Sequence, residues 1–273
     1  MAERMRLKGR TAVITGAASG IGRALAVSLA KRGCDLALSD LNEAGLAETA
    51  RLAGSGVRVS SHRLDVADRA AVAAFPEVVR AAHGRADIVV NNAGVALGGT
   101  FEQVSEADFE WLFEINFWGV VRMTRAFLPL MRESDEARLV NLSSLYGLVA
   151  PPGQTAYSAA KFAVRGFSQA LRHELLGTNI GVTVVHPGGV ATQIARSARV
   201  AGNAPPEEVA RGRAEADRML RLPAEKAGEI IAGGIERREA RVLVGTDAKI
   251  VSLIERAAPV TYWSLLSRLM RRK

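Results

Sequence analysis

The sequence contains one cysteine, Cys34, so no disulfide can form within the chain. Cys34 lies in an apolar run, where a buried free thiol is expected, and we expect a reducing, cytoplasmic location. Residues 1–10 include no apolar stretch long enough for a signal peptide, and no apolar run reaches membrane-spanning length. We therefore expect neither export by a recognisable signal nor a transmembrane span.

Aromatic residues are scarce, at 5%. Lys and Arg outnumber Asp and Glu by 36 to 28, which raises the question of a nucleic-acid partner. Nucleic-acid binding would favour basic residues interleaved with stacking aromatics, or a helix-turn-helix or zinc-finger spacing. The basic residues are instead scattered along segments of helical spacing. We expect no nucleic-acid partner and no metal site.

The sequence is rich in short β-type runs that alternate with longer segments of helical period. Most of these runs are apolar throughout, which is typical of parallel strands covered by helices on both faces. The pattern predicts an α/β, single-domain, doubly wound (Rossmann) parallel sheet, with ligands bound beyond the carboxyl ends of its strands. The seven predicted strands are 11–15, 34–39, 57–64, 87–91, 138–143, 181–186 and 241–245.

Two long helices are predicted, at about 106–131 and 154–176, the first capped by Ser105 with Asp108 three residues later. Between about residues 191 and 222 neither the period of a strand nor that of a helix fits the apolar residues, because Gly and Pro interrupt an Arg-rich stretch. We interpret this stretch as a mobile lid over the site, the alternative being a surface loop without a role. The predicted organisation is a catalytic domain over 1–246 followed by an amphipathic, basic extension over 247–273.

A glycine-rich turn, residues 16–22, directly follows the first predicted strand and precedes a strong helical pattern. Glycines allow the backbone to approach a pyrophosphate, and the following helix directs its free N–H groups at the anion. The order of strand, glycines and helix predicts a dinucleotide site.

Asp40 ends the second predicted strand, about where such folds place the acid that binds the adenosine ribose. A carboxylate repels a 2′-phosphate, and neither Ala17 nor Leu41 offers a compensating charge. NAD is therefore favoured over NADP. The alternative is that Asp40 is only the N-cap of the helix that starts near Asn42.

Tyr157 and Lys161 are four residues apart, so on a helix they lie on one face. A neighbouring ammonium would lower the pKa of the phenol and make it a usable general acid or base. Ser143 and Ser144 stand at the end of the fifth predicted strand, at the edge where the cofactor is expected, and a serine hydroxyl there can hold a substrate oxygen.

These motifs together resemble the short-chain dehydrogenase/reductase family. The similarity covers about residues 7–245, in the right order. The matching segments are 15–22, Asn91-Asn92-Ala93-Gly94, Tyr157-Ser158-Ala159-Ala160-Lys161 and Pro187-Gly188.

The resemblance implies Tyr157 as general acid/base, Lys161 as its electrostatic partner and ribose ligand, and Ser144 as the group that orients the substrate oxygen. Asn116 matches the position that holds a water of the proton relay by bending its helix. The implied cofactor-binding residues are Gly16, Ser19, Gly20, Ile21, Gly22, Asp40, Asp65, Val66, Asn92, Ala93, Gly94, Tyr157, Lys161, Pro187, Gly188, Val190 and Thr192.

Each of the less specific matches has an alternative interpretation. Asn116 could merely cap or kink its helix, Asp65 could end a strand, and Thr192 could begin a helix of the lid. His173 and His186 are interpreted as structural.

The segments expected to face the nicotinamide are mostly apolar, which favours a small apolar secondary alcohol or ketone. An arginine of the lid, Arg196 or Arg199, would change that prediction. The leading hypothesis is an active NAD-dependent oxidoreductase. The alternatives are a catalytically silent NAD(P)-binding regulatory or scaffold protein, and a sugar-nucleotide epimerase or dehydratase, for which the region after the sixth strand is short.

The extension over 247–273 alternates aliphatic and aromatic residues with basic ones. It fits peripheral contact with an anionic membrane, or packing on a neighbouring subunit or on the body. The resemblance further implies a homodimer or homotetramer formed through the two long helices.

Overall fold

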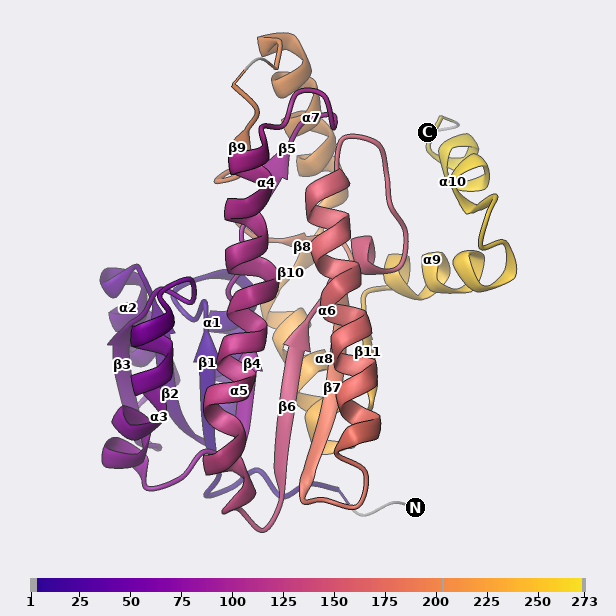
Figure 1. Cartoon of the computed structure of the whole chain (residues 1–273). Helices are drawn as coiled ribbons and strands as arrows, with labels where there is room; N and C mark the ends of the chain where they lie inside the picture. Colours follow the sequence, from indigo (N-terminus) through magenta and orange to yellow (C-terminus); the bar gives the residue numbers. More distant parts are fainter. Residues whose placement is uncertain (1–3, 203, 272–273) are drawn as a thin grey trace.

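Seven parallel strands form the central sheet of the computed structural model, which describes residues 4–202 and 204–271 (Figure 1). The strand order is β11-β7-β6-β4-β1-β2-β3, and every pairing is parallel. The strands are β1 (Thr11–Thr15), β2 (Asp35–Asp40), β3 (Val59–Arg63), β4 (Ile88–Asn91), β6 (Ala137–Leu142), β7 (Ile180–Pro187) and β11 (Arg241–Val244). Each begins and ends within two residues of its predicted bounds, so the sheet prediction is confirmed.

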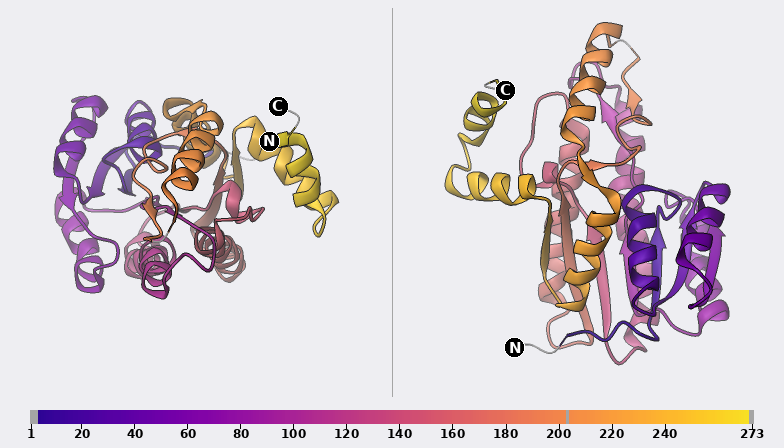
Figure 2. Two further views of the ribbon diagram at one scale, coloured as in Figure 1. Left: turned by 90° about the horizontal axis from the view of Figure 1, so that it is seen from above. Right: turned by 180° about the vertical axis from the view of Figure 1, so that it is seen from behind.

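Helices cover both faces of the sheet (Figures 1 and 2). The helices α3 (Arg69–His83), α5 (Gly119–Arg132) and α6 (Thr155–Glu174) cover one face, and α1 (Gly20–Ala30), α2 (Glu43–Ala53) and α8 (Ala224–Glu236) cover the other. Two apolar clusters fill the layers between helices and sheet. From β1 the strand order runs outward through β2 to β3 on one side, and through β4, β6 and β7 to β11 on the other. The order of the strands therefore reverses at β1, and a ligand crevice is expected at the carboxyl ends of the strands at this point.

The first long predicted helix is interrupted by a π-helical turn. It consists of α4 (Glu106–Phe113), η1 (Glu114–Trp118) and α5. Ser105 caps it as predicted, since its hydroxyl accepts a hydrogen bond from the Asp108 N–H at 3.1 Å. A single π turn inside an α-helix is often found at a functional site.

The predicted lid is more regular than the sequence indicated. It contains β8 (Val190–Ala191), β9 (Arg199–Val200), the 14-residue helix α7 (Pro206–Met219) and β10 (Leu222–Pro223), and β9 pairs with β5 (Leu97–Gly98). None of the α7 residues is buried, so the helix lacks the apolar stripe from which its period could have been predicted. Helix α7 rises above the carboxyl ends of the strands of the central sheet (Figure 1).

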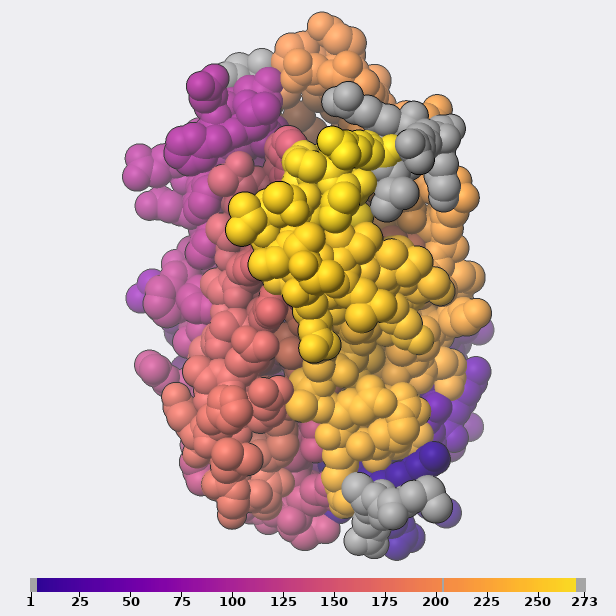
Figure 3. Space-filling model, turned by 90° about the vertical axis from the view of Figure 1, so that its right-hand side faces the viewer, coloured from indigo at the N-terminus to yellow at the C-terminus, as the bar shows by residue number. Residues whose placement is uncertain are grey.

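The extension after β11 forms two helices, α9 (Thr246–Ala257) and α10 (Tyr262–Arg271). In the space-filling view they spread over one side of the molecule, next to α6 (Figure 3). Arg272 and Lys273, which add to the predicted basic charge, lie outside the described residues. Within the described ranges, no helix combines the length and apolarity that crossing a membrane requires.

Candidate active site

The glycine-rich turn between β1 and α1 is shaped so that larger side chains would not fit. Gly16 has a φ of +66°, in the left-handed region that favours glycine. A Cβ at Gly22 would lie 2.2 Å from the Gly16 carbonyl oxygen. The glycines therefore allow a tight turn from β1 into α1, the arrangement in which a helix N-terminus can bind a pyrophosphate.

Thr15 and Asn92 join this turn to the end of β4. The Thr15 hydroxyl accepts hydrogen bonds from the N–H groups of Asn92 and Ala93, both at 3.0 Å. The Asn92 amide donates to the carbonyls of Thr15 and Gly16, at 2.9 and 3.0 Å. Our site prediction missed Thr15, although a hydroxyl at the end of β1 was a usable signal.

Asp40 contacts the glycine-rich turn directly. One carboxylate oxygen accepts from the Ala18 N–H at 3.1 Å, and the other accepts from the Asn42 N–H at 3.0 Å. The N-cap of α2 is Asn42, whose side chain accepts from Gly45 N. The alternative interpretation of Asp40 as that N-cap is therefore wrong.

Three of the four predicted catalytic side chains, those other than Asn116, lie around the start of α6. Lys161 is 4% exposed, and its Nζ donates to the Leu142 carbonyl at 3.1 Å and lies 5.6 Å from the centre of the Tyr157 ring. Ser144 precedes the short helix η2 (Leu145–Gly147), and its hydroxyl accepts from the Tyr146 N–H at 3.1 Å. The Ser144 side chain also interacts with the Tyr157 phenol and lowers its pKa.

The pKa of Tyr157 differs in direction from the sequence prediction. Burial raises it to about 12, which outweighs the opposing effect of Ser144. Burial also lowers the pKa of Lys161 to about 8. Desolvation of the buried phenol therefore outweighs the lowering of its pKa that the sequence predicts, and stabilisation of the phenolate by Lys161 stays a prediction.

Asn116 lies in the π turn and is fully buried. Its side-chain oxygen accepts from the Val95 N–H at 2.8 Å, and its amide donates to the Val95 carbonyl at 2.9 Å. The side chain thus ties the helix to the segment after β4, close to Lys161 and Gly94. The predicted contact with a relay water stays a prediction.

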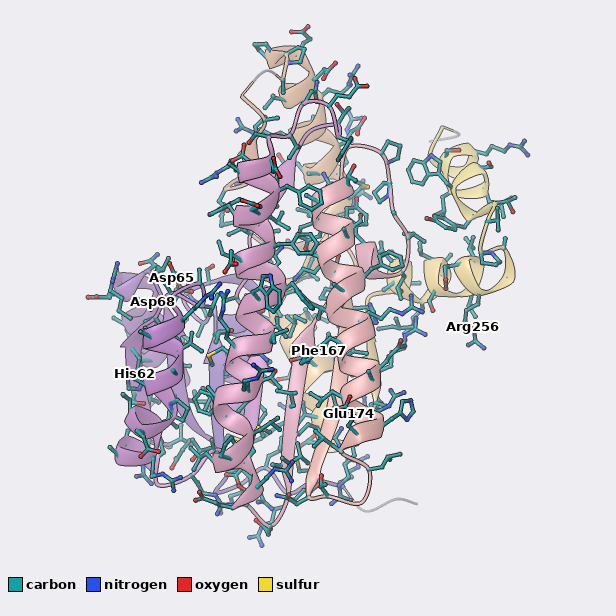
Figure 4. All side chains as sticks on the ribbon, in the orientation of Figure 1. His62, Asp65, Asp68, Phe167, Glu174 and Arg256 are labelled. Carbon is teal, nitrogen blue, oxygen red and sulfur yellow. The ribbon has the colours of Figure 1, made fainter. Side chains whose placement is uncertain are left out.

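Asp65 and Val66 follow β3 at the same edge of the sheet, where Asp65 lies close to Asp68 (Figure 4). The Asp65 carboxylate accepts from the Ala67 N–H at 2.9 Å, while Val66 is buried against Gly119 of α5. Leu64 donates its N–H to the Asp40 carbonyl at 3.1 Å, which places this segment beside the predicted ribose ligand.

The segment after β7 lies on the other side of the glycine-rich turn. Thr192 packs on Gly20, where an added Cβ would lie 3.1 Å from Thr192 Cγ2. Ser19, Gly20 and Thr192 help to line a cavity of about 730 Å³. Thr192 does not begin the lid helix, which starts at Pro206, so that alternative interpretation is wrong.

Asp247 in the first turn of α9 fixes this segment from the other side, and sequence analysis missed it. Its carboxylate accepts from the Gly189 N–H at 2.6 Å and lies against Gly188. An acidic residue in the first turn of a helix predicts only a favourable interaction with the helix dipole. The sequence therefore did not indicate that Asp247 contacts Gly189.

Tyr157 also packs on largely apolar side chains. Tyr157 packs on a cluster that includes Leu97, Leu112, Ala156 and Ala160, and its ring meets that of Tyr146 edge-on at 6.2 Å. Of the arginines in the predicted lid, Arg196 is paired with Asp217 and Arg199 with Asp108. No cluster of three His, Cys, Asp or Glu side chains in the described ranges is placed to hold a metal ion.

The C-terminal extension reaches the loop that follows η2. The hydroxyl of Tyr262 in α10 accepts a hydrogen bond from the Ala150 N–H at 3.1 Å. Of the alternatives for the extension, this contact favours packing on the body.

Comparison with known proteins agrees with this geometry. The family model for short chain dehydrogenases matches residues 10–202. The SadH protein of Mycobacterium tuberculosis is 47% identical over 264 residues, covering 95% of each chain, and the oxidoreductase UcpA of Escherichia coli is 39% identical over 245 residues, covering 88% of this chain and 92% of its own.

Solved structures of the same fold are also similar. A short chain dehydrogenase/reductase from Burkholderia phymatum, in complex with NAD, has a TM-score of 0.85 and 31% identity over 93% of this chain and 95% of its own. An alcohol dehydrogenase from Thermococcus sibiricus, complexed with 5-hydroxy-NADP, has a TM-score of 0.73 and 28% identity over 86% and 94%. The chain therefore belongs to the short-chain dehydrogenase/reductase family of oxidoreductases.

Proposed function

We propose that this protein is an NAD-dependent dehydrogenase/reductase acting on a secondary alcohol or ketone, with Tyr157 as the general acid/base. The placement of the Tyr157 phenol carries the proposal. The phenol interacts with Ser144, has Lys161 beside its ring and packs on an apolar cluster. A phenol in this position can pass a proton to or from a substrate oxygen while hydrogen moves at the adjacent carbon.

The residues present fit a dinucleotide. The glycines of the turn bring no side chain between its backbone and a bound pyrophosphate, and no side chain caps the start of α1, so its first N–H groups are available to an anion. Asp40 lies where its carboxylate would accept hydrogen bonds from ribose hydroxyls, which supports NAD over NADP. Nicotinamide, when bound, supplies or accepts the hydride.

The protein side chains have separate roles in this proposal. Ser144 holds the substrate oxygen and Tyr157 exchanges the proton with it. Lys161 stabilises the negative charge that forms on Tyr157 when the phenol gives up its proton. The apolar cluster beside Tyr157 and the pairing of Arg196 and Arg199 with carboxylates support a substrate without a phosphate or carboxylate group.

An NAD(H)-coupled screen of secondary alcohols and ketones tests this function, with Tyr157→Phe as the matched variant. We expect kcat to fall by about 10²–10⁴-fold, typical of a lost general acid/base, while NADH binding measured by fluorescence persists. Near wild-type turnover by Tyr157→Phe would refute the role of the phenol. NADH binding without turnover of any tested alcohol or ketone would support the alternative, a silent nucleotide-binding protein.

We also propose a cytoplasmic homodimer or homotetramer formed through the two long helices. Trp118 at the π turn and Phe162 on α6 support this assembly, because both are large apolar side chains exposed on these helices. Sedimentation equilibrium tests the assembly, and cell fractionation tests the location.

For the extension we propose packing on the body rather than membrane attachment, because Tyr262 contacts Ala150. Arg256 projects outward from α9, however, as a membrane contact would require (Figure 4). Co-sedimentation with anionic liposomes that is lost on removing residues 259–273 would overturn packing as the role of the extension.

A further inference from the structure

His186 is a buried histidine directly joined to the turn that carries Ser144. Its Nδ1 lies 2.9 Å from the Ser144 carbonyl oxygen, and its side chain is completely buried. Its Nε2 has no hydrogen-bond partner among the described residues. A carbonyl oxygen can only accept, so the hydrogen of a neutral imidazole lies on Nδ1.

His186 lies where the backbone pairing of β6 and β7 ends. The Ser143 N–H still donates to the Val185 carbonyl at 2.8 Å. Pro187 follows on β7 and has no N–H, so the ladder cannot continue with a donor to the Ser143 carbonyl. The imidazole of His186 contacts the next residue, Ser144, just beyond the end of the backbone pairing.

The surroundings of His186 keep the imidazole neutral. Burial lowers its pKa to about 4, the hydrogen bond to Ser144 opposes this shift, and the guanidinium groups of Arg241 and Arg165 lower the pKa further. The same Arg165 donates to the Gly147 carbonyl at 3.2 Å. Two side chains outside the turn therefore hold two of its carbonyl groups.

We propose that His186 is a positioning residue for the reaction, because it fixes the backbone of Ser144 so that the Ser144 hydroxyl faces the Tyr157 phenol. This inference rests on the proposed function. Ser144 has an extended backbone, with φ of −164° and ψ of 170°, and its hydroxyl already accepts from the Tyr146 N–H. Loss of the carbonyl contact frees the residue to rotate, and a displacement of about 1 Å costs as much as 10²-fold in rate.

Two substitutions of similar polarity separate positioning from packing. His186→Asn keeps an amide N–H near the place of Nδ1, whereas His186→Gln carries its amide near the place of Nε2. We expect kcat to fall about 10- to 100-fold in His186→Gln and to stay within about threefold of wild type in His186→Asn. NADH affinity is expected to be unchanged in both. His173→Gln, at an exposed site on α6, is the control and should match wild type.

Equal losses of kcat in the Asn and Gln variants, or an unchanged kcat in His186→Gln, would overturn the inference. Wild-type turnover is measured first, so failure of the proposed function is recognised separately. The ¹⁵N shifts of the His186 ring in the wild-type protein provide a test that needs neither variant to fold. They should show a protonated Nδ1 and an unprotonated Nε2 from about pH 5 to 9, and the opposite tautomer would also overturn the inference.

Discussion

The carboxylate of Asp40 accepts a hydrogen bond from the Ala18 N–H, so the second strand is tied to the glycine-rich turn through the group that would bind the ribose. Replacing this carboxylate changes both the charge and the shape of the ribose site. The neighbouring Leu41 is about half exposed, so an arginine there has room to meet a phosphate.

We therefore predict that Asp40→Ala combined with Leu41→Arg shifts the preference from NAD towards NADP, because a repulsive charge is replaced by an attractive one. The ratio of kcat/KM for the two cofactors is the measurement. Leu41→Arg alone is the control and should produce a smaller shift. An unchanged ratio in the double variant would mean that Asp40 has only a structural role.

The contact between Gly22 and the Gly16 carbonyl predicts a second outcome. Gly22→Ala forces a Cβ to within 2.2 Å of a backbone oxygen. We expect destabilisation of about 1–3 kcal/mol, the usual range for overpacking, and loss of NADH binding. Urea unfolding and fluorescence titration measure the two effects.

Gly166→Ala is the matched control for this substitution. Gly166 lies on α6, and an added Cβ would meet nothing within 4 Å. Replacing a helical glycine by alanine stabilises by roughly 0.5–1 kcal/mol, so the control should gain stability and retain NADH binding. If Gly22→Ala behaved like this control, the tight turn would not be a requirement for the cofactor.

The sheet and the main site residues were predictable because they are encoded locally. Strands such as β1 are mostly apolar and are buried at every position, and the glycine-rich turn follows β1 directly. The resemblance implied a bend at Asn116, but residue spacing alone did not predict the π turn, because Asn116 is held by Val95, 21 residues away in the chain. Helix α7 lacked a signal for a different reason: it buries no residue, so its sequence was not constrained to an apolar stripe.

The role of His186 was also not predictable from sequence. A histidine at the end of a strand is most often a packed or capping residue, and its link to Ser144 joins positions 42 residues apart. The raised pKa of Tyr157 likewise depends on burial produced by the whole fold. Sequence spacing identifies which groups are neighbours, whereas the balance between charge and desolvation requires the packed structure.

Stability should depend on the protonation of His186. Its pKa is about 6.5 in the unfolded chain and about 4 in the folded protein. Between these values the unfolded chain binds more protons, so stability is fully present above pH 6.5 and is lost as the pH falls towards 4. The loss from this one group is about 3 kcal/mol.

The wild-type protein should therefore lose more stability than His186→Asn over this pH range. Free energies of unfolding, measured with urea at several pH values between 7 and 4.5, provide the comparison. Other groups, such as His62 and His83, whose pKa values are also lowered by burial, contribute equally to both proteins. Parallel curves for the two proteins would show that His186 is not buried as a neutral group.

The contact between Tyr262 and Ala150 predicts that the C-terminal extension affects substrate binding. Tyr262→Phe removes only the hydroxyl that accepts from Ala150, in the loop that follows the active-site turn. A hydrogen bond contributes a net of about 1 kcal/mol, so we expect KM for the alcohol or ketone to rise roughly fivefold, with kcat and NADH affinity nearly unchanged. Ser264→Ala, an exposed position on α10, should leave KM at the wild-type value. If Tyr262→Phe also left KM unchanged, the contact would not shape the substrate site, whereas a loss of NADH affinity would place its effect in the cofactor site.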